Sequence, residues 1–186
     1  MSKLNPDIQA VFAAFGQTAY SVQIFEADLI TLLIVLRQMA RLAKNVKDTP
    51  ELFLKKEPIE KFWREEGNRI QNQLEKCTLG QLLKNAFTQS KETLNELNED
   101  QTLPSAFKDI NKQLDRLPFE DWLDALASRN YLFHRFWYDA DDQLGTKEGC
   151  YKLKKHLLNY NDQFENHVDD VRKTLKTLMD IMGCKR

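Results

Sequence analysis

The longest hydrophobic pattern lies at the start of the chain. Apolar residues recur at alternating intervals of three and four over residues 8–46, and only Thr18 interrupts the series. This spacing puts their side chains on one face of a helix, and further apolar residues widen that face beyond a narrow coiled-coil seam. Asn5 and Pro6 suit the N-cap and the first helical position. We therefore expect one helix that ends near Lys47 and packs in a bundle core.

A second long pattern closes the chain. Residues 150–182 repeat the three-and-four spacing, with one extra step of four between Phe164 and Val168 that locally unwinds a supercoil. Thr146 suits the N-cap, and the Asp- and Gly-rich residues 139–145 before it predict a surface turn rather than a calcium loop. No strand alternation is present. The fold class predicted is all-α, an antiparallel helical bundle with long first and last helices.

Shorter helices are predicted between the two long ones. After a connection with two prolines, residues 59–76 form a polar helix. Thr78 and Gln81 make a capping box that opens a third helix, with the charged residues 91–101 as its fraying end. Residues 104–117 predict a short fourth helix.

Length and composition fit a single domain. The 186 residues include only 6 glycines and 5 prolines, which favours few and long helices. We therefore expect residues 1–186 to form one domain, with residues 1–47 as the long N-terminal helix and residues 78–183 as the bundle that carries the motif. The net charge of −1 excludes strong sequence-independent binding to nucleic acid by the chain as a whole, although a local basic cleft is compatible with it.

The cysteines and the hydropathy pattern predict a cytoplasmic protein. Cys77, Cys150 and Cys184 are odd in number and widely spaced, which argues against a disulfide framework and suits a reducing compartment. The first residues lack the build of a signal peptide. The most apolar run, residues 29–36, is far shorter than the roughly 20 residues of a membrane span, so no membrane partner is expected.

The candidate chemistry is concentrated in residues 118–139, PFEDWLDALASRNYLFHRFWYD, which we expect to form one amphipathic helix. Its apolar face gathers large side chains, namely Trp122, Ala125, Leu126, Leu132, Phe133, Phe136 and Trp137. Arg129 projects from the middle of that face, while Asn130 and His134 lie at its edge. A guanidinium in such a place needs either a buried carboxylate partner or a polar cleft.

Other motif searches return nothing. The chain has no glycine-rich phosphate loop, no HExxH, no GxSxG and no paired cysteines, so we predict no cofactor and no metal site. His156 and His167 are interpreted as surface or half-buried residues rather than ligands. Glu26 and Asp28 flank the apolar face of the first helix and are expected to face water or a lysine of another helix.

The succession of Arg129, Asn130 and, five positions after the arginine, His134 resembles the signature of the HEPN superfamily. These are small all-α proteins, many of them ribonucleases of toxin–antitoxin and phage-defence systems. The resemblance covers the six motif residues and the helical context of residues 78–160. It implies a metal-independent endoribonuclease with an RNA substrate, an antitoxin or other regulatory partner protein, and a homodimer in which Arg129 and His134 are catalytic. The dimer seam is expected to include Trp122, Phe133, Phe136 or Trp137.

Helix geometry agrees with a site shared by two protomers. Five residues turn a helix by about 500°, so Arg129 and His134 point about 140° apart and lie roughly 7.5 Å apart along the axis. Two copies can focus them on one phosphate more easily than one copy can. Histidine titrates near neutral pH and can move the proton of a ribose 2′-OH, while arginine stabilises charge on the phosphorane. Asn130 would orient the imidazole or hold a phosphate oxygen, and Arg135 and Tyr138 would bind substrate.

Two alternatives to the nuclease stay open. One is a catalytically inactive HEPN-like bundle that serves as a protein-interaction or nucleotide-binding adaptor, and the other is an unrelated helical interaction protein. In both, Arg129 would pair with a buried carboxylate and His134 would pack or cap. Regulation by tyrosine modification, known in one toxin branch, is not expected because Phe136 occupies the position of that tyrosine.

Overall fold

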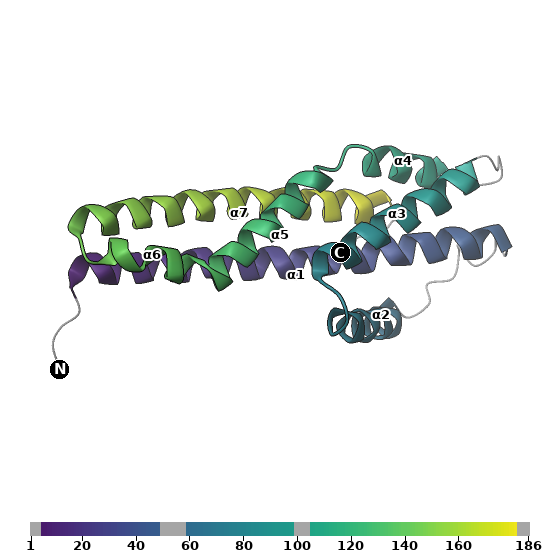
Figure 1. The fold of residues 1–186 in the computed structure, drawn as a ribbon. Helices are drawn as coiled ribbons and strands as arrows, with labels where there is room; N and C mark the ends of the chain where they lie inside the picture. Colours follow the sequence, from purple (N-terminus) through teal and green to yellow (C-terminus); the bar gives the residue numbers. More distant parts are fainter. Residues whose placement is uncertain (1–4, 49–58, 99–104, 182–186) are drawn as a thin grey trace. The chain divides into compact units, whose positions relative to one another are not determined.

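The computed structural model describes residues 5–48, 59–98 and 105–181. These residues form seven helices and no strand (Figure 1). The predicted all-α fold with long first and last helices is confirmed, since the first helix has 43 residues and the last has 35. The helices are α1 (Pro6–Asp48), α2 (Ile59–Leu74), α3 (Leu79–Asn98), α4 (Ser105–Leu114), α5 (Phe119–His134), α6 (Phe136–Leu144) and α7 (Lys147–Ile181).

Three predicted helix starts are confirmed by side-chain hydrogen bonds. Asn5 Oδ1 accepts a hydrogen bond from the backbone N–H two residues later at 2.9 Å. Thr78 and Gln81 form the reciprocal capping box, with N-to-O distances of 3.0 and 3.3 Å. Thr146 Oγ1 accepts from the backbone N–H three residues later at 3.0 Å. Each bond satisfies an amide that the helix itself leaves without a partner.

The segment after the motif departs from the prediction. Residues 118–139 do not form one helix, because the chain leaves helical geometry at Arg135, where φ is −125° and ψ is −26°. The prediction of a turn over residues 139–145 is also wrong, since α6 continues to Leu144. The physical reason is burial: Phe136 and Ala140, four positions apart, are 2% and 1% exposed. This helical spacing outweighs the turn-forming composition.

The chain divides into two compact units. The first unit combines Met1–Asp28 with Pro118–Val171, and the second combines Leu29–Leu117 with Arg172–Arg186. The long helices α1 and α7 therefore each contribute residues to both units.

In the first unit, α5 and α6 run antiparallel to α1. Near the start of α1, Phe12 packs against Trp137 with ring centroids 4.8 Å apart. Further along α1, Glu26 pairs with Arg129, which precedes Trp137 in the chain. Rising numbers on α1 thus meet falling numbers on α5 and α6.

In the same unit, α7 runs parallel to α1, and the two helices begin at the same end (Figure 1). The Thr18 hydroxyl, fully buried, lies 2.9 Å from the carbonyl oxygen of Leu157 and 2.9 Å from that of Ala14 in its own helix. One turn later, Ser21 Oγ donates to Asn161 Oδ1 at 2.8 Å. Thr18, the polar residue that interrupts the apolar series of α1, therefore makes a buried polar contact between α1 and α7.

In the second unit, short polar contacts join neighbouring helices. Arg37 Nη1 of α1 donates to Gln73 Oε1 of α2 at 2.6 Å, and Asn111 Nδ2 of α4 donates to Asn95 Oδ1 of α3 at 2.8 Å. The third helix continues through the charged stretch to Asn98, and residues 99–101, also predicted to fray, lie outside the described residues. Leu94, within this stretch, is fully buried.

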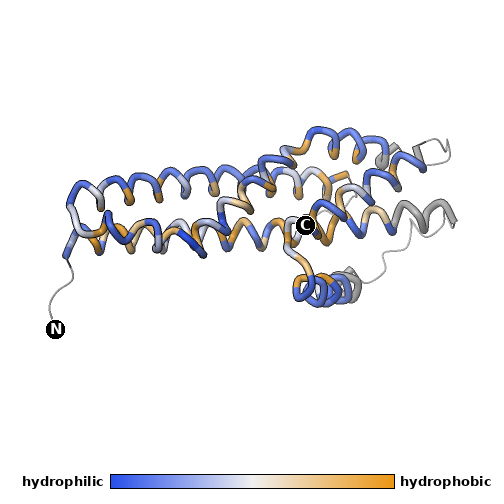
Figure 2. Tube along the Cα trace, in the orientation of Figure 1, coloured by the Kyte–Doolittle hydropathy of each residue, from blue (hydrophilic) through white to orange (hydrophobic). Residues whose placement is uncertain are grey.

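The apolarity of α1 exceeds what the eight-residue run suggested. Residues 8–25 carry no charged side chain, and Pro6–Arg41 is long and apolar enough to cross a membrane by length and composition. Of the most apolar 18-residue stretch of this helix, 44% is buried inside the structure. Figure 2 shows hydrophobic and hydrophilic residues alternating along α1. Such a helix is weak evidence for a span, because the core helix of a soluble protein passes the same test.

Candidate functional site

The residues predicted to act on RNA lie together in the first unit. Arg129, Asn130 and His134 belong to the last part of α5, Arg135 is the link that follows, and Tyr138 lies in α6. One short stretch of chain therefore carries all of them.

Arg129 is held in a half-buried position. Its Nε lies 2.9 Å from Glu26 Oε1, and the two side chains are 31% and 23% exposed. The Nε atom makes no aligned hydrogen bond in the described part of the chain, so this contact is an ion pair of opposite charges. Arg129 Nη1 donates to Asn130 Oδ1 at 3.0 Å, and the guanidinium carbon lies 5.3 Å from the ring centroid of Phe133. These contacts on several sides fix the direction of the guanidinium.

Glu26 has a different partner from the one predicted from the sequence. It was expected to face water or a lysine, but it pairs with Arg129 instead. The sequence pattern indicates that Arg129 needs either a carboxylate partner or a polar cleft. It does not indicate which carboxylate, because the chain has 28 Asp and Glu residues. Only the register between α1 and α5 selects Glu26, and that register is set by aromatic packing across the two helices.

His134 is exposed at the end of α5 and has no hydrogen bond or ion pair within the described ranges. No hydrogen bond joins it to Arg129, as expected for side chains that point apart on one helix. One chain thus provides the arginine and the histidine separately. Asn130, Arg135 and Tyr138 are exposed as well, Tyr138 to 87%.

The apolar face beside the motif is largely buried within the chain. Trp122 is 0% and Phe136 is 2% exposed, so both belong to the core of the chain. Trp137 is half-buried, with its ring centroid 4.7 Å from that of Phe15. Phe133 remains 37% exposed. The homodimer stays a prediction, and of the four residues expected in its seam only Phe133 and Trp137 retain surface to offer.

Tyr131 has a perturbed phenol beside the motif. Burial raises the pKa of Tyr131 above its ordinary value of 10.0, and Asp139 raises it further through its charge and by accepting a hydrogen bond, whereas Arg135 lowers it. The neutral phenol is therefore favoured in the folded state. The neutral phenol of Tyr131 therefore stabilises the fold below the ordinary pKa of tyrosine, and this stabilisation is lost as pH rises through the raised pKa of Tyr131.

This shift can be measured by alkaline titration of ultraviolet absorbance. The chain has 5 tyrosines, and we expect Tyr131→Phe to remove the part of the titration at the highest pH. Tyr138→Phe is the matched control, because Tyr138 is 87% exposed and its replacement should leave the part of the titration at the highest pH in place. If Tyr131→Phe instead removes a part near pH 10, the burial and the Asp139 contact do not act on this phenol.

No group of three or more His, Cys, Asp and Glu side chains within the described ranges is placed to hold a metal ion. Comparison with protein-family models, with curated proteins and with solved structures yields no match for this chain, so its function has to be argued from the residues of α1, α5 and α6.

Proposed function

We propose that this protein is a metal-independent endoribonuclease of the toxin–antitoxin or phage-defence type, which acts on RNA in the cytoplasm as a homodimer. The observation that carries the proposal is the end of α5, where a fixed guanidinium is followed five positions later by an exposed imidazole. Solvent reaches both Arg129 and His134, as a nuclease site requires. Cys77 and Cys150 are free thiols, which suits the reducing cytoplasm.

In the proposed reaction, two protomers place Arg129 and His134 around one phosphate. A neutral imidazole takes the proton of the ribose 2′-OH, and the 2′-oxygen forms a bond to phosphorus. The bond from phosphorus to the 5′-oxygen then breaks, and that oxygen takes the proton from the imidazolium that the first step formed. Arg129 stabilises the charge on the equatorial phosphorane oxygens. The products are a 2′,3′-cyclic phosphate and a free 5′-OH.

Glu26 and Asn130 act as positioning residues in this proposal. Glu26 contacts Nε of Arg129 and Asn130 accepts from Nη1, whereas Nη2 has no partner among the described residues. That nitrogen remains for a phosphate oxygen. Because the Asn130 oxygen is engaged by Arg129, we assign Asn130 to holding the guanidinium rather than to orienting His134.

The first test is the choice of substrate. The purified protein should cleave a mixture of cellular RNAs in the presence of EDTA and leave 2′,3′-cyclic phosphate ends, because the attacking group is the 2′-OH of the substrate. DNA and RNA methylated at the 2′-oxygen should stay intact, since neither offers that nucleophile. Gel electrophoresis and mass spectrometry of the ends measure both results. Cleavage of DNA that stops when EDTA is added would exclude this chemistry.

The second test asks whether two protomers share the site. Arg129→Ala and His134→Ala should each be inactive, and a mixed dimer of the two should regain cleavage. The mixed dimer still holds Arg129 on one protomer and His134 on the other, whereas a site within one chain would stay broken in both. A mixture that stays inactive, or light scattering that shows a monomer at micromolar concentration, would contradict the shared site.

The Arg129–Glu26 ion pair favours a second candidate, the catalytically inactive adaptor. In that case the pair serves the fold, so Arg129→Ala should lower the melting temperature while no RNA is cut by the wild-type protein. A folded wild-type protein that is inert on every RNA tested would support this candidate over the ribonuclease.

A further inference from the structure

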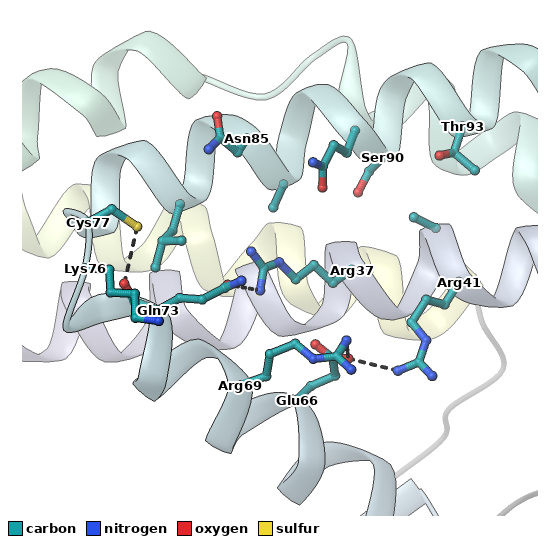
Figure 3. A pocket seen from close by; sticks show the side chains of 14 residues that line it. Arg37, Arg41, Glu66, Arg69, Gln73, Lys76, Cys77, Asn85, Ser90 and Thr93 are labelled. Carbon is teal, nitrogen blue, oxygen red and sulfur yellow. Dashed lines mark hydrogen bonds and ion pairs between the residues drawn. The ribbon is translucent and has the colours of Figure 1, made fainter.

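The second unit contains a pocket that the ribonuclease proposal does not use. It has a volume of about 640 Å³ and is lined by residues of α1, α2 and α3 and of the link after α2 (Figure 3). This size lies within the range of small-molecule sites, which is roughly 300–1,000 Å³. The charged side chains of its lining are Arg37, Arg41, Glu66, Arg69 and Lys76, so four cations face a single carboxylate.

That carboxylate is already committed to two of the cations. Glu66 is 1% exposed, and its Oε1 accepts hydrogen bonds from Arg41 Nη1 at 2.9 Å and from Arg69 Nη1 at 2.8 Å. The Lys76 ammonium group is exposed and has no hydrogen bond or ion pair in the described part of the chain. Arg37 donates to Gln73 Oε1, which is neutral. The pocket therefore keeps an excess of positive charge.

Arg37 is a partly buried cation of this pocket. Burial lowers the pKa of the Arg37 guanidinium from its ordinary value, and the nearby charge of Arg69 lowers it further, while Glu66 and Cys77 raise it. An arginine nevertheless stays protonated at neutral pH. The fold thus holds a partly desolvated cation on the pocket wall, and an anion in the pocket would stabilise its charge.

Glu66 also offers a hydrogen-bond acceptor. Its Oε2 is buried and has no hydrogen-bond partner among the described residues, although Oε1 of the same carboxylate has two. A buried polar atom is normally satisfied, so the unpaired carboxylate oxygen of a residue that lines the pocket fits a donor supplied by a ligand. Hydroxyl groups of a sugar are such donors. The rest of the lining is mixed, with the amides of Asn85 and Gln89 and the apolar side chains of Leu82 and Ala86.

We propose that this pocket binds a ribonucleoside monophosphate. Its phosphate lies against Arg37, Arg69 and Lys76, and a ribose hydroxyl donates to Glu66 Oε2. The ligand thereby meets the excess positive charge and the unpaired acceptor at once. The inference is independent of the ribonuclease proposal, because every lining residue belongs to the second unit.

Calorimetric titration of the full chain tests the proposal, with the four common ribonucleoside monophosphates as probes and with adenosine and inorganic phosphate as partial ligands. At least one monophosphate should bind saturably, about tenfold or more tightly than either partial ligand, because each of these lacks one set of contacts. Arg37→Gln and Arg69→Gln should each weaken that monophosphate by about tenfold or more. The matched control is Arg64→Gln, which removes an exposed arginine of α2 that does not line the pocket. This variant should bind the monophosphate with the same affinity as the wild type.

A second readout does not depend on the variants. Cys77 is a half-buried free thiol of the pocket wall, so the bound monophosphate should slow its alkylation, as followed by peptide mass spectrometry. Saturable binding with protection of Cys77 supports the proposal. No binding by any of the four monophosphates overturns it, as does equal weakening in Arg64→Gln, which would indicate general attraction to charge. Tight binding of single-stranded RNA without binding of monophosphates would also overturn it and assign the cations to a nucleic-acid surface.

Discussion

Replacing His134 by alanine should lower the rate of RNA cleavage by about 10²–10⁴-fold, the usual contribution of a general acid–base group. Arg129→Ala should cause a loss of similar size, because it removes the donor aimed at the charge that develops on phosphorus. Since His134 is exposed and has no partner in the described ranges, His134→Ala should leave helix content and melting temperature unchanged. Single-turnover cleavage and circular dichroism of the same preparations measure both expectations.

His156→Ala is the matched control for this prediction. His156 lies on α7 in the same unit, is exposed, and stacks on Tyr160 with ring centroids 4.7 Å apart. Its loss should not change the cleavage rate. If His134→Ala cuts RNA as fast as the wild type, the proton transfers do not pass through this imidazole and the proposed function fails. If both histidine variants lose activity equally, the loss reflects a general property of the fold.

The largest effect on stability is expected for Trp122→Ala. Trp122 is 0% exposed, so its removal loses the burial of an indole and leaves a cavity, which together cost about 3–5 kcal/mol of unfolding free energy. Urea denaturation followed by circular dichroism measures the change. Trp122→Phe should cost less, because it keeps most of the volume and removes a buried Nε1–H that has no partner among the described residues.

Tyr138→Ala provides the comparison for the tryptophan. Tyr138 is 87% exposed, so its removal should change the unfolding free energy by no more than about 0.5 kcal/mol. The opposite pattern would be informative. If Trp122→Ala leaves the unfolding free energy of the chain unchanged but dissociates a dimer, Trp122 belongs to an interface between protomers and not to the core.

The helices that local signals specify could be predicted from the sequence. The apolar series of α1 and α7 and the caps at Asn5, Thr78 and Thr146 depend on residues within a few positions of one another, and all appear in the structure. The helix α6 was missed because its three Asp residues suggested a turn. Its apolar positions Phe136, Ala140 and Leu144 are spaced by four, but burial against other helices decides whether so short a pattern folds.

The surroundings of the candidate site could be predicted only in part. The exposure of His134 and the need of Arg129 for a partner follow from one helix and its pattern. The choice of Glu26 does not, because it depends on how α1 and α5 are aligned. Trp122 and Phe136 are buried within the chain, although the pattern of residues 118–139 alone suggested that they belong to a dimer seam.

The contacts between α1 and α7 determine when the first unit can fold during translation. Thr18 and its acceptor Leu157 are separated by 139 positions, and Ser21 and Asn161 by 140. The first unit combines Met1–Asp28 with Pro118–Val171, so its early residues are without their partners while Leu29–Leu117 is translated. Contacts of such high sequence separation form slowly and late. We therefore expect a nascent chain that ends before Pro118 to hold Glu26 and the stretch around it without a packed partner, and the guanidinium of Arg129 to reach its fixed position only after α5 has been translated.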